Sequence, residues 1–112
     1  MDDEDNARTL DIFISGGKGR HYVINGLYSH SQDGNWLYRK CGAPGDQALC
    51  IEHCEGRWQI KYESDRGSGT CLANVDGGCA LEDCRSRTWK LVEGGDFVDE
   101  PSVKMVTVAD AD

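Results

Sequence analysis

The sequence contains no apolar run of about 18 residues, the minimum for a helix that crosses a membrane, so no membrane insertion is expected. The first residues, Met-Asp-Asp-Glu-Asp-Asn, are acidic and no apolar stretch follows them, so no signal peptide is expected in this chain. No segment keeps a 3.6-residue apolar period over about ten residues, which leaves little room for α-helix. A basic stripe is missing as well, and nucleic acid is therefore not an expected partner.

The net charge of −8 comes mostly from the two ends of the chain. Without residues 1–5 and 110–112, the acidic count falls to 14 against 12 basic residues, so the body is close to neutral. We expect disordered acidic tails at 1–9 and 109–112, flanking a single β domain at 10–108. Such a chain is either an intracellular protein or a piece excised from a larger one.

Glycine, cysteine and tryptophan are abundant, with 14, 6 and 3 residues in a chain of 112. Turn-rich composition and short apolar stretches predict an all-β fold: a single antiparallel sheet, sandwich or open barrel of about 6–8 short strands with minimal helix. One helical turn is expected between Cys79 and Cys84. Strands are expected near residues 10–15, 21–28, 36–41, 49–54, 57–63, 70–75, 88–92 and 102–108.

The stretch from Leu49 to Glu63 predicts a hairpin with a two-residue turn at Glu55-Gly56, because glycine allows the positive φ of such a turn. Alternation then places one set of side chains on the core face, with the pairs Leu49/Tyr62, Ile51/Ile60 and His53/Trp58. The other face carries Cys50, Glu52 and Cys54 opposite Lys61, Gln59 and Arg57. We expect that second face to be solvated.

The preceding strand pairs with this hairpin if Cys41 faces Cys50, which sets Arg39 opposite Glu52 as a charge pair. The same register places Trp36 and Tyr38 on the core face.

The six cysteines leave three possibilities open: disulfides, buried free thiols or a metal site. Cys50 and Cys54 would lie about 13 Å apart on one strand, which is too far for a disulfide. The candidate bridges are Cys41–Cys50, Cys54–Cys71 and Cys79–Cys84, one of fifteen connectivities. The Cys-x3-Cys and Cys-x4-Cys spacings do not fit zinc knuckles, so no metal is expected. Free thiols would indicate a cytoplasmic protein, and disulfides an extracellular one.

Motifs for catalysis are weak. His53 points away from Cys50 and Cys54 on a strand, so packing against Trp58 is favoured over a cysteine-nucleophile role. The run at residues 16–19, Gly-Gly-Lys-Gly, lacks the spacing of a phosphate loop, so no cofactor is expected. Turns at residues 33–35 and 76–78 do not continue into a calcium-ligand series. Carboxylates that could pair for glycoside hydrolysis, in a fold not expected to have a long cleft, are Glu52, Glu55, Glu63, Glu82 and Asp83.

Tyr28 and Trp36 flank a polar loop. They could pack in the core, or they could form an exposed aromatic platform that binds a sugar or a peptide. Both are therefore candidate binding residues.

Several short elements occur in a defined order: Ile24-Asn25-Gly26-Leu27-Tyr28, Tyr38-Arg39-Lys40, Trp58-Gln59-Ile60-Lys61, Cys79-Ala-Leu-Glu-Asp-Cys84 and Trp89-Lys-Leu-Val. In this order they resemble an uncharacterised β-rich accessory module of algal and protist multidomain proteins, where it accompanies kinase or repeat domains. The similarity covers roughly residues 10–108, and Cys41, Cys50, Cys54 and Cys71 fall outside the pattern. The resemblance implies an interaction module and supplies no catalytic residue.

We therefore expect a non-enzymatic interaction module with a protein partner. Two alternatives remain: an extracellular, disulfide-stapled domain that binds glycans, and a small thiol or redox protein.

Overall fold

The computed structural model describes residues 11–30, 37–42, 48–77, 80–84 and 87–108. The predicted tails at 1–9 and 109–112 lie outside these ranges. Within them the chain forms nine strands and short 3-10 turns and no α-helix, which confirms the all-β prediction with a slightly higher strand count. The strands are β1 (Asp11–Ser15), β2 (Gly26–His30), β3 (Leu37–Lys40), β4 (Leu49–Cys54), β5 (Arg57–Tyr62), β6 (Ala73–Asp76), β7 (Lys90–Glu93), β8 (Asp96–Asp99) and β9 (Lys104–Val108).

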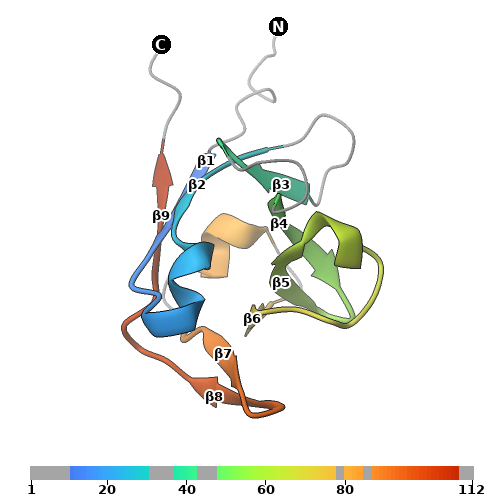
Figure 1. The fold of residues 1–112 in the computed structure, drawn as a ribbon. Helices are drawn as coiled ribbons and strands as arrows, with labels where there is room; N and C mark the ends of the chain where they lie inside the picture. Colours follow the sequence, from blue (N-terminus) through green and yellow to red (C-terminus); the bar gives the residue numbers. More distant parts are fainter. Residues whose placement is uncertain (1–10, 31–36, 43–47, 78–79, 85–86, 109–112) are drawn as a thin grey trace, which may run out of the picture.

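All strands belong to one antiparallel sheet with the order β8-β7-β6-β5-β4-β3-β2-β1-β9. Strands β8 and β9 lie at opposite ends of this order, yet only residues 100–103 separate them in the chain. Such a connection spans less than about 18 Å. The sheet therefore curls until its two ends approach each other, which gives the half barrel seen in Figure 1.

Two contacts tie the ends of the curled sheet together. The 3-10 turn η1 (Gly19–Ile24) carries His21, whose Nε2 lies 2.7 Å from the carbonyl oxygen of Val92 in β7. The Ser102 hydroxyl lies 3.1 Å from the carbonyl oxygen of Gly16, just after β1. Both contacts join segments more than 70 residues apart in sequence, with separations of 71 and 86.

The core fills the concave side of the sheet. Trp58 and Trp89 are its largest buried side chains, and the 3-10 turn η4 (Leu81–Cys84) adds two more at the predicted helical turn. Other core side chains come from every strand except β8 and include Ile12, Ile14, Tyr28, Tyr38, Leu49, Ile51, Ile60, Ala73, Val75, Leu91 and Met105.

The hairpin of β4 and β5 has the predicted register in all six pairs, from Leu49 opposite Tyr62 to Cys54 opposite Arg57. Its turn residues, Glu55 and Gly56, have φ values of 56° and 80°. Positive φ at both central positions is the turn geometry that matches the right-handed twist of paired strands.

The predicted pairing of β3 with β4 is wrong by two residues. Arg39 lies opposite Cys50, and its Nε donates to the carboxylate of Glu63 at 2.8 Å rather than to Glu52. A shift of two keeps every side chain on its predicted face, so Tyr38 still joins the core opposite Ile51. Trp36 lies outside the described residues.

The second face of the hairpin is not solvated as predicted. Gln59 is 2% exposed and Lys61 is 0% exposed, because residues 63–70, here called the strap, cross this face. The Lys61 ammonium donates to Glu52 Oε2 and to the carbonyl oxygen of Ser68, both at 2.6 Å. The Gly67 amide donates to the same Glu52 oxygen at 2.7 Å. An ion pair therefore fastens the strap to the sheet.

Two further elements differ from the sequence-based prediction. The strand expected at 21–28 is η1 followed by β2, and the change occurs at Asn25, whose side chain accepts from and donates to the backbone of Gly17. Strand β8 was not predicted. It pairs with β7 across Gly94 and Gly95, which have φ values of 59° and 91°.

Replacing Lys61 with Ala should destabilise the fold by roughly 3–5 kcal/mol, because it removes the buried cation of the largely buried Glu52 carboxylate and leaves only the partly exposed Arg66, at 4.0 Å. Lys18→Ala, at an exposed position, should change stability by no more than about 0.5 kcal/mol. Urea denaturation measures both values. Equal midpoints for the two variants would contradict this role of the ion pair.

Candidate functional site

The first candidate binding residue, Tyr28, is not on an exposed platform. Its side chain is 0% exposed, and its hydroxyl donates to the carbonyl oxygen of Ile24 at 2.7 Å. Burial raises the pKa of Tyr28 well above its ordinary value. This corrects the expectation that Tyr28 binds a ligand at the surface, because the strand alternation that turns Leu27 and Ser29 to the outer face turns Tyr28 into the core. The second candidate, Trp36, lies outside the described residues.

The predicted bridges Cys41–Cys50 and Cys54–Cys71 do not form, since all four of these cysteines are free. In the observed register of β3 and β4, Arg39 lies opposite Cys50, so Cys41 lies two residues beyond the position that faces Cys50. Cys54 lies at the turn end of the hairpin, whereas the chain after Cys71 pairs with Ile60. Cys79 lies outside the described residues, so its bridge to the buried Cys84 stays a prediction.

Two of these thiols are poorly suited to nucleophilic chemistry. Burial, followed by the nearby Glu63 and Glu52 carboxylates, raises the pKa of Cys50 to about 12. Burial also raises the pKa of Cys71. A raised pKa keeps a thiol protonated, and the protonated form is a weak nucleophile.

The other candidate residues described by the structure make packing contacts or hydrogen bonds within the fold. His53 packs edge-on against Trp58 with ring centroids 5.1 Å apart, as expected, and its Nε2 lies 2.8 Å from the Gly77 carbonyl oxygen. Glu52 and Glu63 accept from Lys61 and Arg39. In the described ranges no three His, Cys, Asp or Glu side chains gather in a way that could hold a metal ion.

A different surface stands out on the convex side of the sheet. Phe13 in β1 lies between Leu27 of β2 and Val106 of β9, so the three apolar side chains form a row across neighbouring strands. Phe13 is 41% exposed and Val106 is 49% exposed. The outer face of a one-layer antiparallel sheet normally carries polar side chains. An apolar row at these positions is therefore a candidate binding surface.

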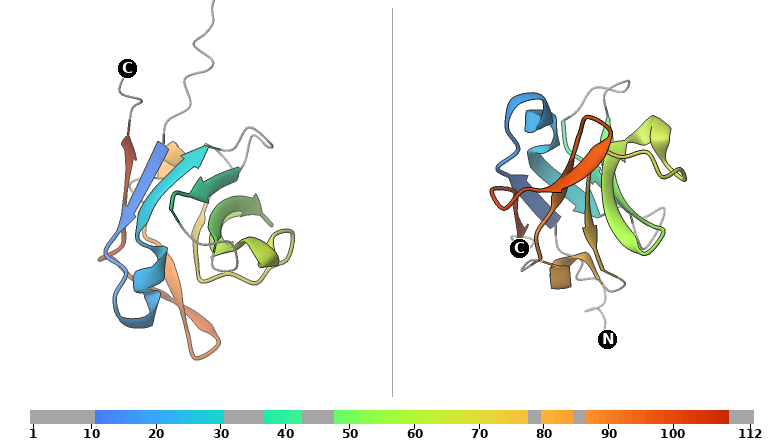
Figure 2. Two further views of the ribbon diagram at one scale, coloured as in Figure 1. Left: turned by 45° about the horizontal axis from the view of Figure 1, so that its top comes forward. Right: turned by 90° about the horizontal axis from the view of Figure 1, so that it is seen from below.

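The apolar row ends at an open edge of the sheet. Within the described part of the chain, β9 pairs with β1 on one side only. The left view of Figure 2 shows β9 at the margin of the sheet, followed by β1 and β2. Val108, also exposed, continues the outer side of this strand. We define the β9 edge surface as the free side of β9 together with the outward side chains of Phe13, Leu27, Val106 and Val108.

The other edge strand, β8, is protected against pairing. It begins with Asp96 and ends with Asp99, and Pro101 follows shortly after it. Charged residues and proline are the usual means of protecting a sheet edge. The four residues of β9 after Lys104, Met-Val-Thr-Val, contain neither. The two edges therefore differ, and β9 is the one open to a partner strand.

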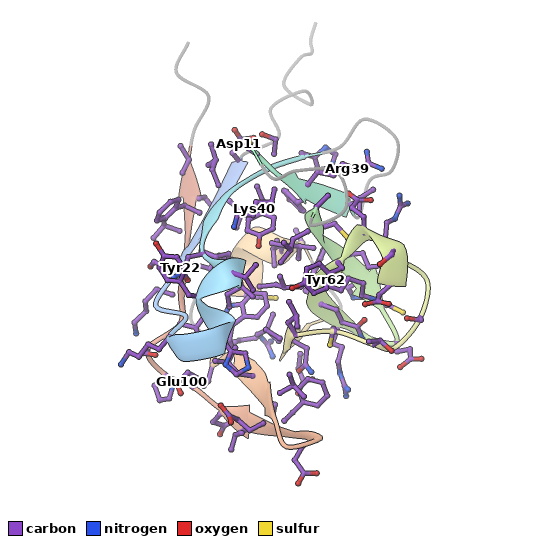
Figure 3. All side chains as sticks on the ribbon, viewed as in Figure 1. Asp11, Tyr22, Arg39, Lys40, Tyr62 and Glu100 are labelled. Carbon is purple, nitrogen blue, oxygen red and sulfur yellow. The ribbon has the colours of Figure 1, made fainter. Side chains whose placement is uncertain are left out.

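The turn at residues 100–103 positions β9. The Ser102 hydroxyl donates to Glu100 Oε2 at 2.8 Å, or alternatively to Gly16, since it has one proton to share. Figure 3 places Glu100 and Asp11 toward opposite ends of the molecule, and β9 runs between these levels beside β1. Hydrogen bonds from the Ser102 side chain and backbone lower the pKa of Glu100.

The sequence-based reading did not identify this surface, although it contained a signal for it. Residues 12–14, Ile-Phe-Ile, are apolar at three adjacent positions of a strand, so one of them must face away from the core. Met105 and Val106 repeat the pattern in β9.

The comparisons with known proteins give no further guide: no protein-family model, curated protein or solved structure matches this chain. None of the described segments forms a helix long and apolar enough to span a bilayer.

Native alkylation with iodoacetamide should modify Cys41 first, because its side chain is exposed. Cys50 should react more slowly by a factor on the order of 100 or more, because burial suppresses its thiolate. Peptide mass spectrometry after timed quenching measures both rates. An unreactive Cys41 would contradict the free-thiol assignment and restore the disulfide prediction.

The Glu100–Ser102 contact should contribute to stability only when the carboxyl group is ionised. Because the folded pKa of Glu100 lies below its ordinary value of 4.5, the contribution is present above that pH and is lost as the pH falls through the folded pKa. The difference in Tm between wild type and Ser102→Ala should therefore be largest near neutral pH and should shrink below pH 4.5.

Thermal melts of the two proteins from neutral to acidic pH measure this difference. Ser64→Ala, at an exposed position in the turn η3 (Glu63–Asp65), serves as the control and should show no such trend. A gap for Ser102→Ala that widens on acidification would overturn the assignment.

Proposed function

We propose that this protein is a non-enzymatic interaction module that binds a protein partner through the β9 edge surface. The observation that carries the proposal is the apolar row of Leu27, Phe13 and Val106, in which Phe13 and Val106 are exposed and which ends at the free edge of β9. An extended segment of a partner can add to such an edge by main-chain hydrogen bonds, while its side chains select the sequence.

The two parts of the surface have complementary roles in this proposal. Backbone groups on the free side of β9 supply affinity that does not depend on the sequence of the partner. Phe13 and Val106 favour a partner strand with an apolar side chain at the matching outward position. Exposed aromatic and aliphatic groups of this kind lose water on binding, which favours association.

The resemblance to accessory modules of multidomain proteins supports the same conclusion, because such modules bring partners together. The two alternative functions receive less support. Burial of Tyr28 removes half of the aromatic platform on which the glycan-binding alternative relied. The raised pKa values of Cys50 and Cys71 weaken the thiol-enzyme alternative.

A synthetic peptide of alternating threonine and valine, flanked by lysines, tests whether the edge accepts a strand. We expect the peptide to shift the amide NMR signals of β9 and of Phe13 in the isotope-labelled chain. Val106→Lys should abolish these shifts, because it adds a charge at the end of the apolar row that lies on the edge strand.

The matched control is Val98→Lys on the protected edge strand β8, where the exposed fraction of 46% is close to the 49% of Val106. This variant should bind the peptide as wild type does. Unmoved β9 signals at millimolar peptide, with the wild-type chain folded, would refute the proposal.

A further inference from the structure

We infer that the β9 edge surface pairs with the same surface of a second copy of this chain, so that two half barrels join into one continuous sheet. The inference rests on the function proposed above and names its partner. It is carried by the register of the outer face, which is self-complementary in shape and in charge.

A two-fold symmetric pair of identical edge strands must be antiparallel, because each strand meets the other after a half turn. The register that uses all five residues of β9 places Val106 opposite its own copy and Lys104 opposite Val108 of the second copy. The outer face of one copy then continues into the outer face of the other, and the inner face into the inner face, since residues directly opposite each other lie on the same side of a sheet.

The apolar row becomes continuous across this junction. In each copy Leu27, Phe13 and Val106 lie side by side on the outer face. The join brings the two Val106 side chains to neighbouring strands, so the row extends from β2 of one copy to β2 of the other. The exposed part of each Val106 side chain is thereby removed from water.

Charge complementarity favours a second copy over an unrelated strand. Asp11 lies beside Val108 on the outer face, and Lys104 of the second copy lies beside Val108 on its other side. The two charged residues are then two strands apart, or about 10 Å between backbones, which their side chains can bridge. Neither Asp11 nor Lys104 makes an ion pair with any other described residue. The two-fold symmetry of the pair means that this Asp11–Lys104 contact occurs twice.

The surface involves one five-residue strand and a short apolar row, so it is small beside a standard interface. We therefore expect a reversible dimer with a Kd on the order of 10–100 μM. Sedimentation velocity of the full chain over a concentration series that spans this range measures it. The expected result is a sedimentation coefficient that rises from the monomer value to the dimer value.

Substitutions test the site and the register. Val106→Lys should leave a folded monomer, because Val106 is half exposed and the change places like charges opposite each other. Val98→Lys on β8 should dimerise as wild type does. Circular dichroism and thermal melts verify that both variants fold.

A charge exchange tests the partner directly. Lys104→Glu alone and Asp11→Lys alone should each weaken dimerisation about ten-fold, because each replaces two attractions with two repulsions. The double variant should regain most of the wild-type association, since it restores opposite charges in the reversed order. Failure of the double variant to recover association would overturn the proposed register.

The outcomes separate this inference from the proposed function. A chain that stays monomeric at all concentrations, while β9 still binds the alternating peptide, refutes the second copy and leaves the interaction module standing. A monomer that also ignores the peptide refutes both. A dimer that persists in Val106→Lys shows association through another surface and overturns the inference.

Discussion

The architecture depends on one constraint: a four-residue connection, residues 100–103, joins two strands that lie at opposite ends of a nine-strand sheet. A flat or gently twisted sheet of this width cannot satisfy it, because its edges would lie tens of ångströms apart at about 4.8 Å per strand. The curl that satisfies it creates a concave side, where the core forms, and a convex side. His21 and Ser102 hold the closure from within the fold.

Local chemistry made the central hairpin predictable. A turn with positive φ at Glu55 and Gly56, together with strict alternation on both sides, leaves one register that separates the faces. The same reasoning could not decide whether the second face is solvated. Alternation shows which side chains share a face, whereas the cover over that face depends on the strap. The strap is fixed by the contacts of Ser68 with Lys61 and of Gly67 with Glu52, and neither contact leaves a periodic signal in the sequence.

The candidate site was less predictable than the fold for a related reason. Three adjacent apolar residues in β1 indicate that one side chain faces outward, but they do not indicate whether it lies in the middle or at the edge of a sheet. That position follows from the strand order. Strand β9 comes directly after β8 in the chain, but it pairs with β1, at the other end of the sheet order. Tyr28 shows the same limit: its place beside a polar loop left both burial and exposure open, and the alternation of β2 buries it.

An exposed apolar edge is normally a hazard, because identical edges can add strand after strand into fibres. Here the two edges of the sheet are unequal. Strand β8 carries Asp96 and Asp99, and every residue of β8 is exposed, so another β8 strand would meet like charges there. Pairing of β9 with β9 consumes the one unprotected edge of each copy and leaves β8 at both ends of the joined sheet. Isologous contacts of this kind close on themselves, whereas a β8-to-β9 contact would propagate. If the proposed pair forms, β8 lies at both ends of the joined sheet, and its carboxylates disfavour further growth by β8-to-β8 contact.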